Sequence, residues 1–97
     1  MKKEVIVLSL GGSLIIPDRV DYVYLRNFKK TINSHKKDYK FVIVCGGGSL
    51  ARKYISVLKK DKKNQEFQSY AGIASTRTNA RFMSYFFGIN PHGFTKG

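Results

Sequence analysis

GGGSLARKY, residues 46–54, follows the apolar run FVIVC and leads into a segment with helical periodicity. A similar junction lies near the start of the chain, where EVIVLSL precedes Gly11, Gly12 and Ser13. Near-continuous apolar runs are typical of strands that are covered on both faces, as in parallel sheets. Glycines at the end of such a strand remove Cβ atoms, so that another group can approach the backbone closely. The two junctions therefore predict an α/β fold with glycine-rich strand–helix turns.

The rest of the chain has the periodicity of further helices. Leu25, Phe28 and Ile32 are spaced i, i+3 and i+7, which predicts an amphipathic helix. Two strands are expected, over 5–10 and 41–45. Three helices are expected: one over about 21–36, one that begins after an N-cap at Ser49, and one over about 70–87 that ends before Gly88, with a loop over 59–65. The two strands and the helix between them form a βαβ unit. Because two strands alone make no stable sheet, we expect the opening half of an α/β domain, with its other strands missing or supplied by a partner.

The composition favours a globular unit with anionic partners. The chain has 97 residues, 42% of them hydrophobic, and a formal net charge of +12 from 18 Lys and Arg against 6 Asp and Glu. This balance predicts a nucleotide, a nucleic acid or an acidic surface as partner, or else a lysine coat that serves solubility. The length predicts one small domain or a part of a larger one.

The cysteine, histidine and hydropathy patterns predict a cytoplasmic protein without a metal site of its own. Cys45 is the only cysteine, so no disulfide can form within one chain, and a reducing compartment fits. His35 and His92 have no partner at metal-ligand spacing. The start of the chain lacks a signal-peptide cleavage pattern, and no stretch reaches the ~18 apolar residues of a membrane span.

The position of the glycines predicts a phosphate site. Ligands of α/β sheets bind outside the carboxyl ends of the strands, and a helix N-terminus offers free N–H groups and the positive end of the helix dipole. Arg52, three residues after Ser49, could add a guanidinium to the same phosphate. The alternative is a tight turn that needs glycine for steric reasons alone. Neither the P-loop pattern nor a GxGxxG fingerprint is present.

Three segments carry a resemblance to a known family: LSLGGSLI at 8–15, VIVCGGGSLARKYI at 42–55 and GIASTRTNARFM at 72–83. In this order and spacing they resemble the amino acid kinase superfamily, and within it the archaeal-type uridylate (UMP) kinases. The first two motifs are shared with acetylglutamate, carbamate and isopentenyl phosphate kinases. The third motif, with its core of Thr76, Arg77, Asn79 and Ala80, is more specific to UMP kinases.

The resemblance implies a partial three-layer α/β sandwich, with residues 1–97 as the N-terminal part of the domain. It also implies transfer of the ATP γ-phosphoryl group to UMP, giving UDP, with Mg²⁺. The implied site residues divide by ligand: Gly12, Ser13, Gly48 and Arg52 for ATP, and Gly47 and Ser69 for UMP. Arg52 would also be catalytic, by stabilising the moving phosphoryl group. Family enzymes are oligomers, so a homo-oligomer or a complementing C-terminal half is expected.

The sequence departs from the family pattern in three ways. Ser69 replaces an acidic residue that binds the nucleotide's ribose, and Ser9 replaces a lysine that many members carry before the glycine pair. The family domain is also more than twice as long, and its later half supplies the nucleoside part of the ATP site and a catalytic aspartate. Two alternatives stay open: another kinase of the superfamily, and a non-catalytic basic module that binds nucleotide or RNA. Arg77 and Arg81, one turn apart, also fit a solvated or subunit-facing stripe.

Overall fold

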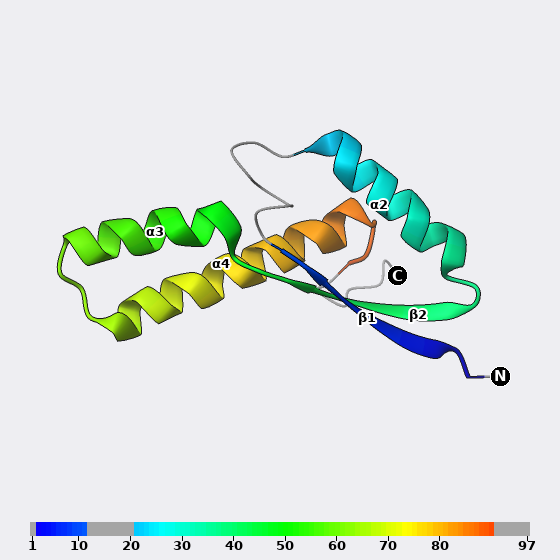
Figure 1. The fold of residues 1–97 in the computed structure, drawn as a ribbon, viewed down its shortest axis with the longest axis horizontal. Coiled ribbons are helices and arrows are strands. Elements are labelled where there is room, and N and C mark those ends of the chain that lie inside the picture. The colour runs from blue at the N-terminus through cyan, green and yellow to red at the C-terminus, as the bar shows by residue number, and fades with distance from the viewer. Residues whose placement is uncertain (1, 12–20, 91–97) are drawn as a thin grey trace, which may run out of the picture.

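The computed structural model describes residues 2–11 and 21–90 of the chain. It contains two strands and three helices in the order β1 (Glu4–Leu10), α2 (Tyr22–His35), β2 (Tyr39–Cys45), α3 (Gly48–Lys60) and α4 (Gln65–Phe86) (Figure 1). This order confirms the expected α/β class.

The two strands are parallel and joined through α2, as expected for a βαβ unit. Leu10 at the end of β1 is opposite Cys45 at the end of β2. The Gly46 N–H then donates to the Leu10 carbonyl oxygen at 3.1 Å, which extends the pairing by one residue. The two glycine clusters of the sequence therefore follow strand ends that lie at the same edge of the sheet. This edge is where ligands of α/β proteins bind.

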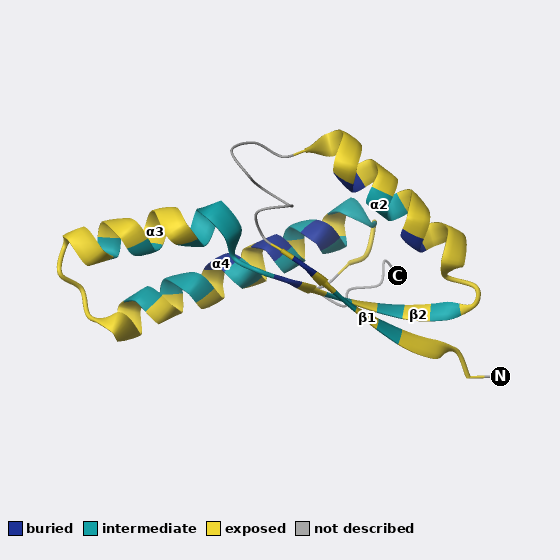
Figure 2. Cartoon of the chain, viewed as in Figure 1, coloured by how far each residue is buried: buried dark blue, intermediate teal, exposed yellow. Residues whose placement is uncertain are grey.

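The two faces of the sheet differ in exposure, and the burial colours accordingly alternate along the strands (Figure 2). On one face, Leu10 and Cys45 are buried with Leu25 of α2 and Met83 of α4, and these four side chains form the core. The other face is open, with exposed fractions between 43% and 64% at Val5, Val7, Val42 and Val44. The expectation of strands covered on both faces is therefore wrong for this chain. The described helices cover one face of the sheet only, so the strands alternate between partly buried and exposed positions, and each ends at a buried residue.

Helix α4 connects two parts of the molecule. Its first half lies beside α3, and this helical pair extends beyond the end of the sheet, whereas its second half covers the sheet (Figure 1). The helix ends at Gly88, where φ is +74° and the Ile89 N–H donates to the Ser84 carbonyl oxygen at 2.9 Å. This arrangement is a Schellman cap, and it confirms Gly88 as the stop.

Two helix starts differ from the sequence expectation. Helix α3 has Gly47 as its N-cap and begins at Gly48, so the N-cap expected at Ser49 is wrong. Helix α4 begins at Gln65, about a turn and a half before the expected start at 70. The Asn64 side chain accepts a hydrogen bond from the Phe67 N–H at 3.2 Å and so caps α4. The polar composition of 59–65 concealed this cap, because that segment has no apolar periodicity.

No helix in the two described ranges is long and apolar enough to cross a membrane.

Candidate phosphate-binding site

The turn between β2 and α3 has steric reasons of its own for two glycines. Gly47 has ordinary dihedral angles, φ −82° and ψ −28°, but a Cβ there would lie 2.7 Å from the Ala51 Cβ. Gly48 has φ +60°, in the left-handed region that favours glycine. The steric alternative therefore accounts for both glycines without any ligand. A phosphate site at this turn needs other support.

The side chain of Asn79 in α4 forms hydrogen bonds to this turn. Its side chain is fully buried, and its Nδ2 donates to the Gly46 carbonyl oxygen at 2.8 Å and to the Gly47 carbonyl oxygen at 3.2 Å. These bonds join residues more than 30 positions apart in the sequence. They fix the first turn of α3 against the middle of α4.

An open cavity of about 620 Å³ lies between α3 and α4, next to the glycine turn that joins β2 to α3. The N-cap and first turns of α3 and residues 69–77 in the middle of α4 line it: Gly47, Gly48, Ala51, Arg52, Ser69, Gly72, Ile73, Thr76 and Arg77. Its volume is within the usual range for small-molecule sites. The four described residues that the family pattern assigns to ligands, Gly47, Gly48, Arg52 and Ser69, thus lie on one cavity.

The cavity is electropositive. Arg52 and Arg77 line it from the two helices, and neither forms an ion pair with any described residue. The sequence has no Asp or Glu between Tyr39 and Lys60, nor anywhere after Glu66. No carboxylate is therefore among the lining residues to neutralise the two guanidinium groups. This environment favours an anion, and guanidinium groups suit phosphate in particular.

The structure includes some of the residues expected at the site and leaves others untested. Gly12 and Ser13, expected to contact ATP phosphates, lie outside the described residues. Sequence reasoning did not assign Asn79 a role, although it singled out the motif that contains it. The sequence also fits a solvated or subunit-facing stripe for Arg77, and the structure places this residue on the cavity. Its spacing of eight residues from Ser69 placed both on one helix face, a signal that could have grouped them.

The described residues offer no ligand set for a metal ion. Within 2–11 and 21–90, no three His, Cys, Asp or Glu side chains gather closely enough to hold one. Mg²⁺ prefers oxygen ligands, carboxylates above all, and the lining of the cavity contains none. The residues present therefore do not fit a Mg²⁺ site, and the Mg²⁺ that the resemblance implies stays a prediction.

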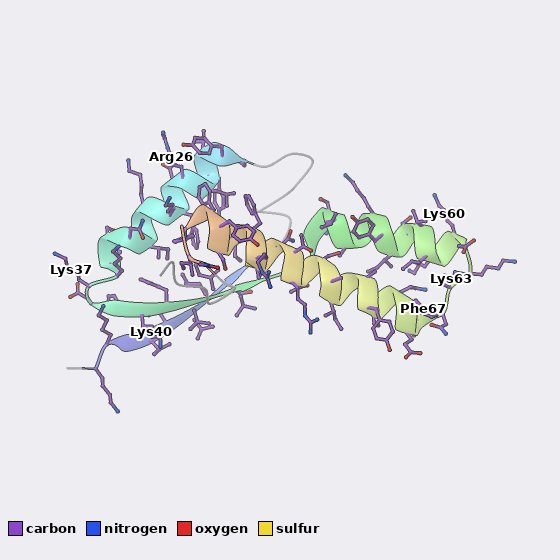
Figure 3. The ribbon with its side chains drawn as sticks, turned by 180° about the vertical axis from the view of Figure 1, so that it is seen from behind. Arg26, Lys37, Lys40, Lys60, Lys63 and Phe67 are labelled. Atoms are coloured by element: carbon purple, nitrogen blue, oxygen red, sulfur yellow. The ribbon has the colours of Figure 1, made fainter. Side chains whose placement is uncertain are left out.

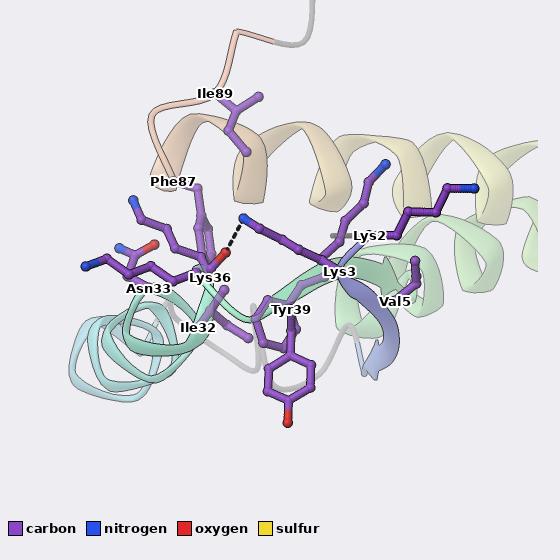
Figure 4. Close-up of a pocket in the computed structure, with 12 residues that line it drawn as sticks. Lys2, Lys3, Val5, Ile32, Asn33, Lys36, Tyr39, Phe87 and Ile89 are labelled. Atoms are coloured by element: carbon purple, nitrogen blue, oxygen red, sulfur yellow. Dashed lines mark hydrogen bonds between the residues drawn. The ribbon is translucent and has the colours of Figure 1, made fainter.

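A larger cavity lies at the opposite end of the sheet (Figure 4). It has a volume of about 840 Å³, and five lysines line it together with Tyr39, Phe41 and Phe87: Lys2, Lys3, Lys36, Lys37 and Lys40. It adjoins the amino ends of both strands, away from the glycine turn. Other lysines lie elsewhere, such as Lys60 and Lys63 at the tip of the α3–α4 pair (Figure 3). The positive charge is therefore spread over the molecule and not confined to the candidate site.

Comparison with known proteins identifies the family. The model of the amino acid kinase family matches residues 4–96. The chain belongs to this family. It is 44% identical over 90 residues to the uridylate kinase of Thermoplasma acidophilum, and this alignment covers 91% of the chain and 38% of that protein. It is 36% identical over 78 residues to the uridylate kinase of Pyrococcus abyssi, covering 80% of this chain and 35% of that protein.

A solved family structure has the same fold. The crystal structure of uridylate kinase from Archaeoglobus fulgidus superimposes with a TM-score of 0.72 and 39% identity, over 84% of this chain and 36% of that one. The present chain thus spans little more than a third of the length of the relatives it matches.

Proposed function

We propose that the chain forms the N-terminal, phosphate-binding part of a UMP kinase. The reaction is transfer of the γ-phosphoryl group of ATP to UMP, giving UDP, in pyrimidine nucleotide synthesis in the cytoplasm. Support comes from the relatives, which are named uridylate kinases. The observation that carries the proposal is the cavity that gathers Gly47, Gly48, Arg52 and Ser69 next to a helix N-terminus.

In this proposal, the residues of the chain position two phosphates and stabilise charge. Gly47 faces the UMP phosphate, while Gly48 and Arg52 face the ATP phosphates together with Gly12 and Ser13. Catalysis of phosphoryl transfer depends mostly on such positioning and charge stabilisation and little on covalent chemistry. Arg52 is the catalytic residue because its guanidinium lies at the cavity without a competing carboxylate. The residues that line the cavity include no carboxylate that would hold the Mg²⁺ implied by the resemblance.

The proposal includes a partner that completes the domain. The face of the sheet with Val5, Val7, Val42 and Val44 is apolar and exposed, whereas parallel sheets are normally covered on both faces. The remainder of a kinase domain, in the same or a second polypeptide, covers this face, and the completed protein is a homo-oligomer. The 97-residue chain alone is expected to bind nucleotide without completing the reaction.

Nucleotide titration tests the proposal. The purified chain is titrated with UMP, CMP and ATP at low and high salt, with binding followed by NMR or calorimetry. Saturable binding that prefers UMP over CMP and persists at high salt is the expected result. Equal and weak binding of all three nucleotides would contradict a UMP site within this part of the domain.

The lysine-lined cavity supports a second candidate function, binding of a polyanion such as single-stranded RNA. Five lysines and the ring of Tyr39 line it, and basic grooves with aromatic side chains are typical of single-strand binding. Two carboxylates, Glu4 and Asp38, lie next to it in the sequence and reduce its charge. This function requires no UMP site.

Salt dependence distinguishes the two functions. An oligouridylate bound through phosphates loses affinity steeply with salt, with a slope of about −0.7 per phosphate contact. Replacing Lys36, Lys37 and Lys40 by Glu should abolish RNA binding and leave UMP binding unchanged. If UMP affinity falls equally in this variant, then general charge, and not the glycine turn, holds the nucleotide.

A further inference from the structure

We propose that Asn79 is a positioning residue that aims the backbone N–H groups of Gly47 and Gly48 at the phosphate site. The proposal deepens the kinase function above and rests on it for the identity of the ligand. Asn79 does not line the cavity. It acts through the peptide groups of the glycine turn, to which its side chain is bonded.

Because a peptide unit is planar, a contact that fixes its carbonyl group also fixes the direction of its N–H group. In a trans peptide, the C=O and the N–H of one unit point in opposite directions, and the described residues contain no cis peptide. Asn79 Nδ2 bonds the carbonyl oxygens of Gly46 and Gly47. The N–H groups of the same two peptide units belong to Gly47 and Gly48. Both therefore point to the side of the turn away from Asn79.

These two N–H groups are unused within the described chain. The Gly46 N–H bonds to Leu10 and so continues the sheet, and the Ala51 N–H bonds to the Gly47 carbonyl oxygen and so begins the helix. No described residue accepts a hydrogen bond from the N–H of Gly47 or Gly48. Adjacent free N–H groups at a helix N-terminus are the donors that bind phosphate oxygens.

A glycine turn needs an external restraint to hold this orientation. Glycine has more accessible backbone conformations than any other residue, so three successive glycines do not fix their own peptide planes. The Asn79 amide provides the restraint from a fully buried position.

The amide orientation of Asn79 is itself determined by its contacts. A flipped amide would place Oδ1 against two carbonyl oxygens, which are also acceptors. In the observed orientation, Oδ1 is buried without a hydrogen-bond partner. Asn79 thus keeps both donor contacts with the turn although its own acceptor is left unsatisfied, and the contacts with the turn determine its orientation.

The first test measures the turn directly and needs no ligand. Backbone ¹⁵N relaxation is recorded for Gly47 and Gly48 in the 97-residue chain and in the variants Asn79→Ala and Asn79→Asp. The second variant preserves the shape of the side chain but removes the donor. We expect the order parameters of the two amides to fall from about 0.85 to below 0.6 in both variants. Unchanged order parameters would overturn the proposal.

A matched control comes from the same helix. Ser75 is 1% exposed, and its hydroxyl donates within α4 to the Ala71 carbonyl oxygen at 2.8 Å. Ser75→Ala therefore removes a buried hydrogen bond of α4 that does not reach the Gly46 or Gly47 carbonyl. We expect the Gly47 and Gly48 amides to keep their order parameters in this variant. Equal mobility in the Ser75 and Asn79 variants would mean that α4 acts by general packing, and this result would also overturn the proposal.

The second test measures UMP affinity. We expect Asn79→Ala and Asn79→Asp to weaken UMP binding at least tenfold, and Ser75→Ala to change it less than threefold. If the wild-type chain binds no UMP but the turn loosens in the Asn79 variants, the proposed function fails and the positioning role stands. If UMP binds the wild type and the Asn79 variants equally, the positioning role fails and the function stands.

Discussion

Replacing Gly47 by alanine tests whether internal packing alone requires a glycine at this position. The added Cβ would lie 2.7 Å from the Ala51 Cβ, closer than real Cβ atoms approach one another. It would also lie 3.5 Å from the Gly72 carbonyl oxygen and 3.5 Å from the Ser75 Cβ, so it has little room to move toward α4. The first turn of α3 must therefore shift to accept the methyl group.

The expected cost follows from this contact. Inserting an extra methyl group into a packed site destabilises by about 1–3 kcal/mol. Alanine is also a poorer N-cap than glycine, and Gly47 is the N-cap of α3. Backbone strain adds nothing at this residue because its φ of −82° suits any side chain. We therefore expect Gly47→Ala to lower the free energy of unfolding by about 1–3 kcal/mol, or Tm by roughly 4–8 °C per kcal/mol for a chain of this length.

Gly72→Ala is the matched control. Gly72 lies inside α4, and an added Cβ there would meet only the Ile55 Cδ1, at 3.8 Å, an ordinary contact. Alanine inside a helix is about 0.5–1 kcal/mol more favourable than glycine, so this variant should be slightly more stable than the wild type. Urea unfolding followed by circular dichroism at 222 nm measures both variants.

The relative stability of Gly47→Ala and Gly72→Ala decides whether the steric account is correct. If Gly47→Ala is as stable as the wild type, or more stable than Gly72→Ala, the steric account of the glycine turn is wrong. If Gly47→Ala keeps its stability and loses UMP binding, the glycine serves the approach of a ligand, as the sequence alone suggested.

Three further predictions concern single side chains. The first uses a chimera that joins residues 1–90 to the matching C-terminal part of T. acidophilum uridylate kinase. In this chimera, Arg52→Ala should lower kcat by about 10²–10³-fold with little change in UMP affinity. An unchanged kcat in a steady-state assay would rule out the catalytic role. Ser69→Asp restores the acidic residue of the family pattern and should raise UMP affinity by about tenfold, since hydrogen bonds to charged groups are stronger; calorimetry checks this against Thr78→Asp, an equal change of charge outside the cavity. Burial raises the pKa of the Cys45 thiol above its ordinary value, so the unfolded chain loses this proton first as pH rises; stability should fall above the ordinary thiol pKa, and less so in Cys45→Ala, as measured by urea unfolding between pH 7 and 10.

The sequence predicted the elements that repeat a local pattern. The apolar runs, the spacing of Leu25, Phe28 and Ile32 and the glycine at 88 depend on contacts between near neighbours, and the structure confirms the strands and helices that they predicted. The start of α4 was missed because the Asn64 cap depends on one side-chain bond and not on periodicity. The strand–helix junction predicted the glycine turn and Arg52 at one phosphate site, whereas Ser69 could be added to them only through the family resemblance.

The sequence by itself determined the family, the βαβ order and the presence of two glycine-ended strands, because motif order and hydrophobic period are properties of the linear chain. Tertiary structure alone decided what holds the glycine turn. The bonds from Asn79 join residues separated by up to 33 positions, and such bonds form only when α4 packs against the end of β2. The steric need for glycine at 47, in contrast, arises mainly from Ala51, only four residues away. The uncovered face of the sheet is likewise a property of the tertiary structure, because the burial of a strand depends on which segments pack against it and not on the strand's own residues.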